Sequence, residues 1–308
     1  MKILKAYKFG WQFLLSHWRL LLILYLVNFV FALLAAFPLN NYLQSTVAHT
    51  LSVQESLEGF NYGIISDFLN EYGTGLAVVF NQSLVVMLFF FILNIFFTGG
   101  ILNLIKYQPC GYDSSTFWRG CTKYFWRFFR LTLYFLITHI ALFFLCYTIF
   151  IKVSGGANFL EMENDLQIIN GLKIALPIYL VLVFFVFLFN DYFKLHIVDF
   201  EKRYLFQPFV SNLKFLSKNV LRGAGLYLIN IISFVIIFVT FYYFTKPMVA
   251  QTYLGILLLF VVNQVWIVLK TGIKISGVPM TEDAVRHSLR KNPLMNMTSL
   301  TRIYWHAF

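Results

Sequence analysis

Charged side chains are scarce in this sequence. Only 12% of its 308 residues are Asp, Glu, Lys or Arg, whereas 59% are hydrophobic and the mean hydropathy is +0.73. Soluble globular domains carry about 25% charged residues, and a surface with so few would leave many of the 37 Phe and 18 Tyr in water. The shortage of charge therefore excludes an ordinary soluble domain and indicates a protein whose solvent is lipid.

Residues suited to catalysis and metal binding are sparse as well. The three cysteines are too few for a disulfide framework and match no zinc or redox spacing, so we expect reduced, structural thiols at Cys110, Cys121 and Cys146. The six histidines are scattered, without an HExxH pattern or a carboxylate at ligand spacing. No GxSxG, P-loop or Rossmann motif occurs. The sequence therefore predicts a protein that is not an enzyme and holds no metal or cofactor.

Long apolar segments dominate the rest of the chain. Crossing a bilayer takes about 20 apolar residues as a helix, and six segments qualify: 20–38, 76–98, 131–151, 173–190, 224–245 and 252–269. Their runs of Phe, Leu and Ile lack the alternation of a transmembrane β-barrel, and a helix satisfies its own backbone in lipid. The predicted fold is an all-α polytopic bundle of six transmembrane helices, the last two forming a tight hairpin.

Basic residues are distributed unequally along the chain. Of the 24 Lys and Arg, 21 lie in residues 1–19, 106–130, 191–222 and 270–308. The alternate loops hold seven acidic residues but only Lys152, Lys173 and Lys246. By the positive-inside rule both termini are cytoplasmic, and no small-residue cleavage site follows the first apolar segment, so we expect that span to be retained. We predict a multi-pass protein of the bacterial cytoplasmic (inner) membrane.

The net charge of +11 has two explanations, membrane topology and binding to nucleic acid. No RNA- or DNA-binding motif accompanies the charge. We therefore attribute it to topology and to attraction for anionic headgroups, and expect no nucleic-acid partner.

The loop between the first two predicted spans is long enough for structure of its own. Residues 52–55 (SVQE) have the form of a capping box, and residues 60–73 predict a short helix that ends at Gly73. A lid, a surface for a partner and a spacer all fit this loop, and docking or packing against the outer ends of the bundle is the favoured interpretation.

Short motifs repeat in the spans. The odd spans share a Leu-Tyr motif: LYLVN (24–28), LYFLIT (133–138) and LYLIN (226–230). The even spans share the pattern Phe-x-x-Asn-x-x-aromatic: FILNIFF (91–97), FLFNDYF (187–193) and FVVNQVW (260–266). We predict three pseudo-repeats, at about 1–110, 111–203 and 204–280, that form one transmembrane domain, followed by a cytoplasmic tail at 281–308.

An amphipathic stretch precedes each odd span, at residues 5–19, 117–130 and 206–222. In the second, basic residues recur every three or four positions on one helical face, opposite an aromatic face. Basic, aromatic-rich helices lie in the membrane interface and bind anionic lipid. The candidate contacts with anionic lipid of the cytoplasmic leaflet are Arg119, Lys123, Arg127, Arg130, Lys214, Lys218 and Arg222.

Polar groups within the spans are mostly amides. The candidate intramembrane contacts are Asn28, Asn94, His139, Asn190, Asp191, Asn230 and Asn263. Such amides either join helices by hydrogen bonds or line a pocket for a neutral ligand, and joining helices is favoured. For His139 we expect a neutral ring in an interhelical hydrogen bond. For Asp191 an ion pair with Lys194 is favoured over a cation site or a proton path.

The order of these features resembles that of a known group. An aromatic interfacial helix, a pair of spans, a Thr-Gly-Gly exit (98–100) and a re-entry at STFWRG (115–120) are similar to bacterial six-span membrane proteins, many uncharacterised. They include the membrane domain attached to some glycerophosphodiester phosphodiesterases. The catalytic phosphodiesterase domain has no counterpart in this chain, so the resemblance implies the architecture and no lipid-hydrolysing activity.

Two functions fit the sequence. The first is a non-enzymatic scaffold, accessory subunit or assembly factor with a membrane-protein partner or a second copy of itself. The alternative is a transporter or binder of lipid or another apolar or amphipathic molecule, bound between repeats beside Asn94, Asn190 or Asn263. An enzyme would need clustered titratable residues that the sequence does not display.

Overall fold

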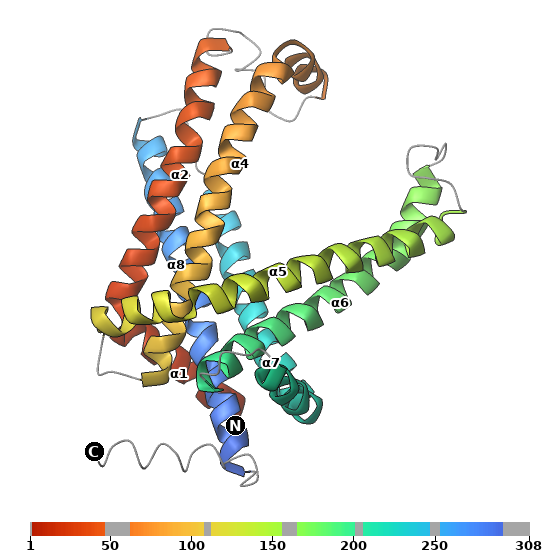
Figure 1. The fold of residues 1–308 in the computed structure, drawn as a ribbon. Helices are drawn as coiled ribbons and strands as arrows, with labels where there is room; N and C mark the ends of the chain where they lie inside the picture. Colours follow the sequence, from red (N-terminus) through yellow and green to blue (C-terminus); the bar gives the residue numbers. More distant parts are fainter. Residues whose placement is uncertain are drawn as a thin grey trace. The chain divides into compact units, whose positions relative to one another are not determined.

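A computed structural model describes residues 2–46, 62–107, 112–155, 165–200, 206–246 and 253–291. Within these ranges every regular element is an α-helix (Figure 1): α1 (Lys2–Ser16), α2 (Trp18–Thr46), α4 (Tyr62–Tyr107), α5 (Ser114–Val153), α6 (Asp165–Phe200), α7 (Phe206–Thr245) and α8 (Tyr253–Lys291). The last six of these are long and apolar enough to cross a membrane. The prediction of an all-α protein with six transmembrane helices is confirmed at this level.

The helices extend well beyond the predicted spans. Only the first amphipathic stretch forms a separate helix, α1, which ends where the Ser16 hydroxyl and the His17 ring meet the Phe13 carbonyl. The other two stretches continue without a break into the spans, as parts of α5 and α7. No proline or glycine separates stretch from span at Arg130 and Leu131. α5, with 40 residues, is about 60 Å long, roughly twice the thickness of the hydrocarbon core.

The chain forms two compact units, Met1–Trp18 with Thr98–Phe308, and Arg19–Phe97. In the smaller unit, α2 and α4 pair through the rings of Phe31 and Phe90, 5.4 Å apart. The Tyr42 hydroxyl donates to the Tyr72 carbonyl at 2.7 Å.

Gly73 does not end a helix, contrary to the prediction, because α4 continues through it. Its neighbour Gly75 lies against the Tyr42 ring, where a Cβ atom would come within 2.5 Å of the hydroxyl oxygen. Gly75 therefore allows α2 to pack closely against α4 and does not end α4. The capping-box residues 52–55 lie outside the described part of the chain. The predicted tail begins inside α8, and residues 292–308 lie outside the described part.

In the larger unit, helices pack in sequential pairs: α5 with α6, α6 with α7, and α7 with α8 (Figure 1). α1 packs against α8 and, over a smaller area, against α7. Its side chains contact both, since Tyr7 bonds to Ser233 at 3.0 Å and Leu14 packs against Gly272.

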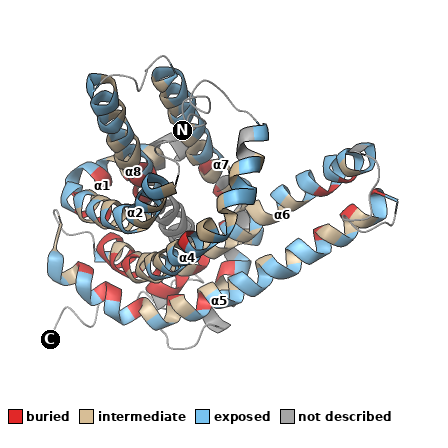
Figure 2. Cartoon of the chain, turned by 90° about the horizontal axis from the view of Figure 1, so that it is seen from above, coloured by how far each residue is buried: buried red, intermediate tan, exposed pale blue. Residues whose placement is uncertain are grey.

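The core of the larger unit lies at the ends of the helices that carry the basic residues. The largest fully buried side chains there are Leu104, Ile105, Phe117, Tyr124, Phe128, Leu131, Leu188, Tyr192, Ile197 and Ile275. Further along α5 and α6, toward the hairpin loop, most residues are exposed or half-buried (Figure 2). Exposed apolar side chains are suited to lipid in that region, whereas Cys146, Phe150, Ser154 and Ala175 are buried near the far ends of the two helices.

A close helix crossing organises this core. The last turns of α4 meet the first turns of α5 at Gly99 and Gly120, where a Cβ on either glycine would lie 2.8 Å from the other's carbonyl oxygen. A Cβ on Gly120 would also lie 2.3 Å from that of Asn103, whose amide donates to the Thr116 carbonyl at 2.7 Å. Small residues permit such close backbone approach between membrane helices.

Gly120→Ala should destabilise the protein. The added methyl has no space at the crossing, and overpacking of this kind costs about 1–3 kcal/mol. The measurement is thermal unfolding in detergent, with Gly73→Ala as the matched control, because nothing lies within 4 Å of a Cβ there. The control should be neutral or gain up to about 1 kcal/mol from helix propensity. Equal unfolding midpoints for the two variants would show that the crossing is not tight.

α5 begins at a polar cap. Asp113 accepts hydrogen bonds from the backbone amides of Ser115 and Thr116, both at 3.1 Å, and from the Thr116 hydroxyl. These bonds, that of the hydroxyl foremost, hold the pKa of Asp113 below its ordinary value of 3.8. Because the folded state favours the ionised carboxylate, Asp113 stabilises the fold above its unfolded pKa, and this stabilisation is lost as the pH falls through the folded pKa.

Asp113→Asn should flatten the acid end of the stability profile. Asparagine caps helices nearly as well as aspartate but has no proton to gain. We expect similar unfolding temperatures for both proteins at neutral pH and a steeper fall for the parent below about pH 4. Thermal unfolding across a pH series measures this, and parallel profiles would show that the charge of the cap has no effect.

Candidate functional site

An apolar groove of about 750 Å³ lies among α5, α6 and α7. Its size falls within the usual range for ligand pockets, about 300–1,000 Å³. Apart from Tyr134 and Thr138 its lining is wholly apolar, formed by Leu131, Phe135, Leu142, Leu182, Phe185, Val186, Phe189, Phe193, Phe209 and Leu216. The arrangement suits a hydrocarbon chain, and the lining holds no carboxylate, His, Lys or Cys side chain.

Helical periodicity produces this lining. The contributions of α5 recur at three- and four-residue steps from Leu131 to Leu142 and so share one face. Those of α6 do the same from Leu182 to Phe193. α7 supplies the end of the groove, where the Phe209 ring lies 5.5 Å from Phe189 and 5.8 Å from Phe193.

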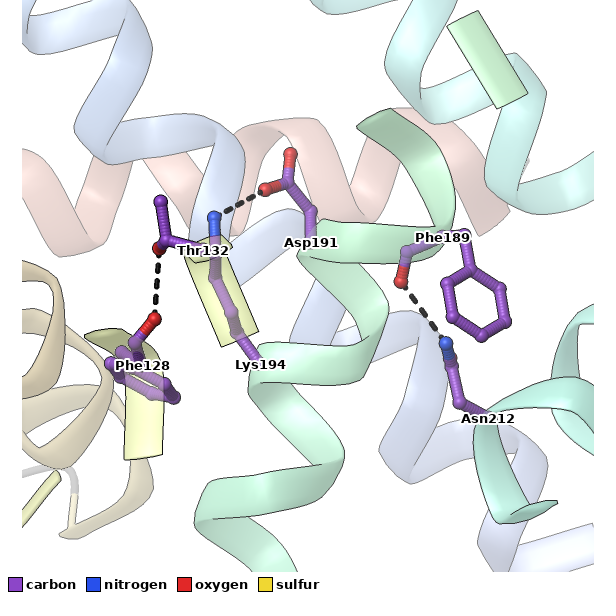
Figure 3. Close-up of polar contacts among 6 residues, drawn as sticks. All are labelled: Phe128, Thr132, Phe189, Asp191, Lys194 and Asn212. Carbon is purple, nitrogen blue, oxygen red and sulfur yellow. Dashed lines mark hydrogen bonds and ion pairs between the residues drawn. The ribbon is translucent and has the colours of Figure 1, made fainter. Parts of the chain in front are cut away.

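A buried amide holds α7 at this end. The Asn212 side chain is fully buried, and its Nδ2 donates to the Phe189 carbonyl at 3.0 Å (Figure 3). Asn212, like Asn103 at the α4–α5 crossing, was missed by the sequence reasoning, which considered amides only within the spans. Its position in the sequence could have indicated burial, because Asn212 lies on the apolar face of its amphipathic stretch, between Phe209 and Leu216.

The predicted intramembrane amides do not converge on the groove. Asn28, Asn94 and Asn263 each donate to the carbonyl four residues earlier in their own helix, at 2.8, 2.9 and 2.9 Å. Asn230 lies against Gly277, where a Cβ would be 2.6 Å from its Nδ2, and so contributes to the contact of α7 with α8. Asn190 has a buried Oδ1 that accepts no hydrogen bond from the described residues. None of the five lines the groove, so the expectation of a ligand site beside Asn94, Asn190 or Asn263 is not supported.

His139 differs from its prediction. Its Nδ1 bonds to the Phe135 carbonyl in the same helix at 2.7 Å, which places the proton on Nδ1 because a carbonyl only accepts. The ring packs against Phe187 of α6 at 5.0 Å. The predicted interhelical hydrogen bond does not form within the described residues, where Nε2 is buried without a partner. The carbonyl one turn back is simply the nearest acceptor.

The expected ion pair between Asp191 and Lys194 is present, at 3.2 Å (Figure 3). The Tyr227 hydroxyl faces Asp191 from α7, and Lys274 of α8 lies within electrostatic range of Asp191. One carboxylate beside the two ammonium groups of Lys194 and Lys274 disfavours a cation site. A half-exposed pair of this kind contributes little to stability.

The arrangement of basic and aromatic residues predicted for α5 is present, except at one basic residue. Phe117, Cys121, Tyr124 and Phe128 are buried, whereas the face opposite exposes Arg119, Lys123 and Arg130. Lys214 of α7 is exposed, and the side chains of Lys218 and Arg222 lie outside the described part of the structure.

Arg127 is the exception on this face. It is half-buried and lies over the Tyr124 ring, 5.7 Å from its centre. Its Nη1 is buried without an acceptor among the described residues.

Among the described residues, no group of three or more His, Cys, Asp or Glu side chains could hold a metal ion. Comparison with known proteins finds no matching family model, no matching curated protein and no matching solved structure. The site must therefore be interpreted from its own geometry.

Proposed function

We propose that this multi-pass membrane protein is not an enzyme and that it binds lipid or another apolar or amphipathic molecule in the groove of α5, α6 and α7. The observation that supports this is the groove itself, with about 750 Å³ of space and an almost wholly apolar lining. The proposal places the protein in a bacterial cytoplasmic membrane, with the basic ends and both termini in the cytoplasm.

The shape of the groove supports binding of a chain-like ligand. The stripe on α5 extends from Leu131 to Leu142, about 16 Å along the helix axis. Phe209 and Leu216 of α7 form one end of the lining. Tyr134 and Thr138 add hydroxyl groups, although the Thr138 hydroxyl already donates to the Tyr134 carbonyl at 2.9 Å. An elongated apolar ligand fits better than a compact polar one.

Val186→Trp should abolish occupancy of the groove. The indole would fill space beside Phe189 and exclude a ligand chain. Native mass spectrometry of the purified protein should show bound lipid in the parent and near-background levels in the variant. Ile137→Trp is the matched control, since Ile137 is 64% exposed on α5 and does not line the groove. Equal lipid retention by Val186→Trp and the parent would contradict the proposal.

A scaffold or accessory subunit is the second candidate, and Asn263 favours it. This amide is exposed on α8, among apolar neighbours such as Phe260 and Val261 that are 53% and 47% exposed. Polar side chains on a lipid-facing surface promote association with another membrane helix. A partner subunit or a second copy of this chain would provide such a helix.

Asn263→Leu should weaken that association if the second candidate holds. Interhelical bonds of this type contribute about 0.6 kcal/mol on average, so complexes in mild detergent should be reduced and not abolished. Blue-native electrophoresis followed by mass spectrometry of co-purified proteins measures the effect. Asn28→Leu is the control within α2. A monomer without co-purified protein in the parent would rule out this role.

A further inference from the structure

We propose that the groove selects a phospholipid with a net anionic headgroup and that Arg127 binds the headgroup phosphate at the basic end. The inference rests on the proposed function and adds the class of ligand. It assigns Arg127 to a specific site, in contrast to the general attraction between exposed basic residues and the membrane surface.

The register of α5 places Arg127 at the end of the groove. Arg127 precedes Leu131, the first lining residue of α5, by four positions. Residues with this spacing lie on one helix face, with Cβ atoms about 5–6 Å apart. Because helical side chains lean toward the N-terminus, the guanidinium extends from the groove toward the basic end, as its position over Tyr124 shows. A chain in the groove would therefore carry its headgroup close to Arg127.

The guanidinium group of Arg127 also has a nitrogen without a hydrogen-bond acceptor. Nη1 is buried and has no acceptor among the residues that the structure describes, and Arg127 forms no ion pair with any of them. Leaving a buried donor of a charged group unpaired is costly. A phosphate provides several anionic oxygens, and arginine binds such groups through two parallel hydrogen bonds. A small rotation of the side chain toward the groove would allow this.

The surrounding charge favours a headgroup with net negative charge. Arg130 lies three residues from Arg127 and is exposed, with its Nε donating to the Trp126 carbonyl at 3.2 Å. α5 and α7 contain no acidic residue, and at this end of α6 Asp191 already pairs with Lys194. The ammonium group of a zwitterionic headgroup would find Arg127 and Arg130 on α5 and no carboxylate on α5 or α7. A phosphatidylglycerol headgroup avoids that repulsion.

The experiment is a competition between two lipids with the same chains. The purified protein is titrated with dioleoylphosphatidylglycerol and dioleoylphosphatidylcholine at equal concentrations, and bound species are counted by native mass spectrometry. The parent should prefer phosphatidylglycerol about tenfold, because both lipids offer Arg127 the same phosphate and only phosphatidylcholine brings an ammonium group beside Arg127 and Arg130. Arg127→Gln should bring the ratio close to one while phosphatidylcholine binding persists. Arg119→Gln, an exposed arginine two turns earlier, should keep the preference.

The outcomes separate this inference from the proposed function. Equal binding of both lipids by the parent, abolished by Val186→Trp, overturns the role of Arg127 and leaves the groove as a lipid site. Binding of neither lipid overturns both. Equal loss of preference in Arg127→Gln and Arg119→Gln indicates general surface attraction and also overturns the inference. Arg127→Met, which keeps the aliphatic stem, replaces Arg127→Gln if that variant does not fold.

Discussion

The backbone contact between Gly99 of α4 and Gly120 of α5 is the constraint on which the larger unit depends. Two helices approach this closely only when neither carries a side chain at the crossing. The approach brings the Asn103 amide to the Thr116 carbonyl and buries Phe117 and Cys121 against Gly100. It also sets where α5 starts, and α5 supplies one wall of the groove.

Packing at the basic ends has a consequence for the rest of the larger unit. Leu131 and Leu188 are buried, whereas Ile137 and Leu180 are 64% and 57% exposed. The two helices pack at this end and again at the far end, where Phe150 and Ser154 lie against Gly171, and the groove lies between the two contacts. In water such exposed apolar surface would drive collapse. Lipid supplies the missing contacts, so a groove for a hydrocarbon chain is stable there without polar lining groups.

Much of the fold was predictable from the sequence, because span length and hydrophobicity determine transmembrane helices directly. The errors arose where the prediction rested on a few neighbouring residues and the packing of the helices decided the structure instead. Gly73 was taken as a stop signal, yet α4 continues past it and Gly75 accommodates Tyr42. The stretch at 117–130 was assigned to the membrane interface, whereas in the structure it forms one continuous helix with the span that follows. The groove could not be predicted, since it depends on how α7 crosses α6 at Phe209.

The repeated asparagines show why polar residues in spans are poor indicators of a binding site. An amide in a membrane helix finds an acceptor in the carbonyl one turn back, as Asn94 and Asn263 do, and needs no ligand. The guanidinium of Arg127 has more donors than one backbone carbonyl can accept and is always charged. The Nη1 of this half-buried side chain has no acceptor among the described residues, and an anionic oxygen is the partner that we propose for it. The bonds of Asn94 and Asn263 to their own helices therefore give no evidence of a ligand, whereas the unpaired Nη1 of Arg127 is the observation behind the proposed phosphate site.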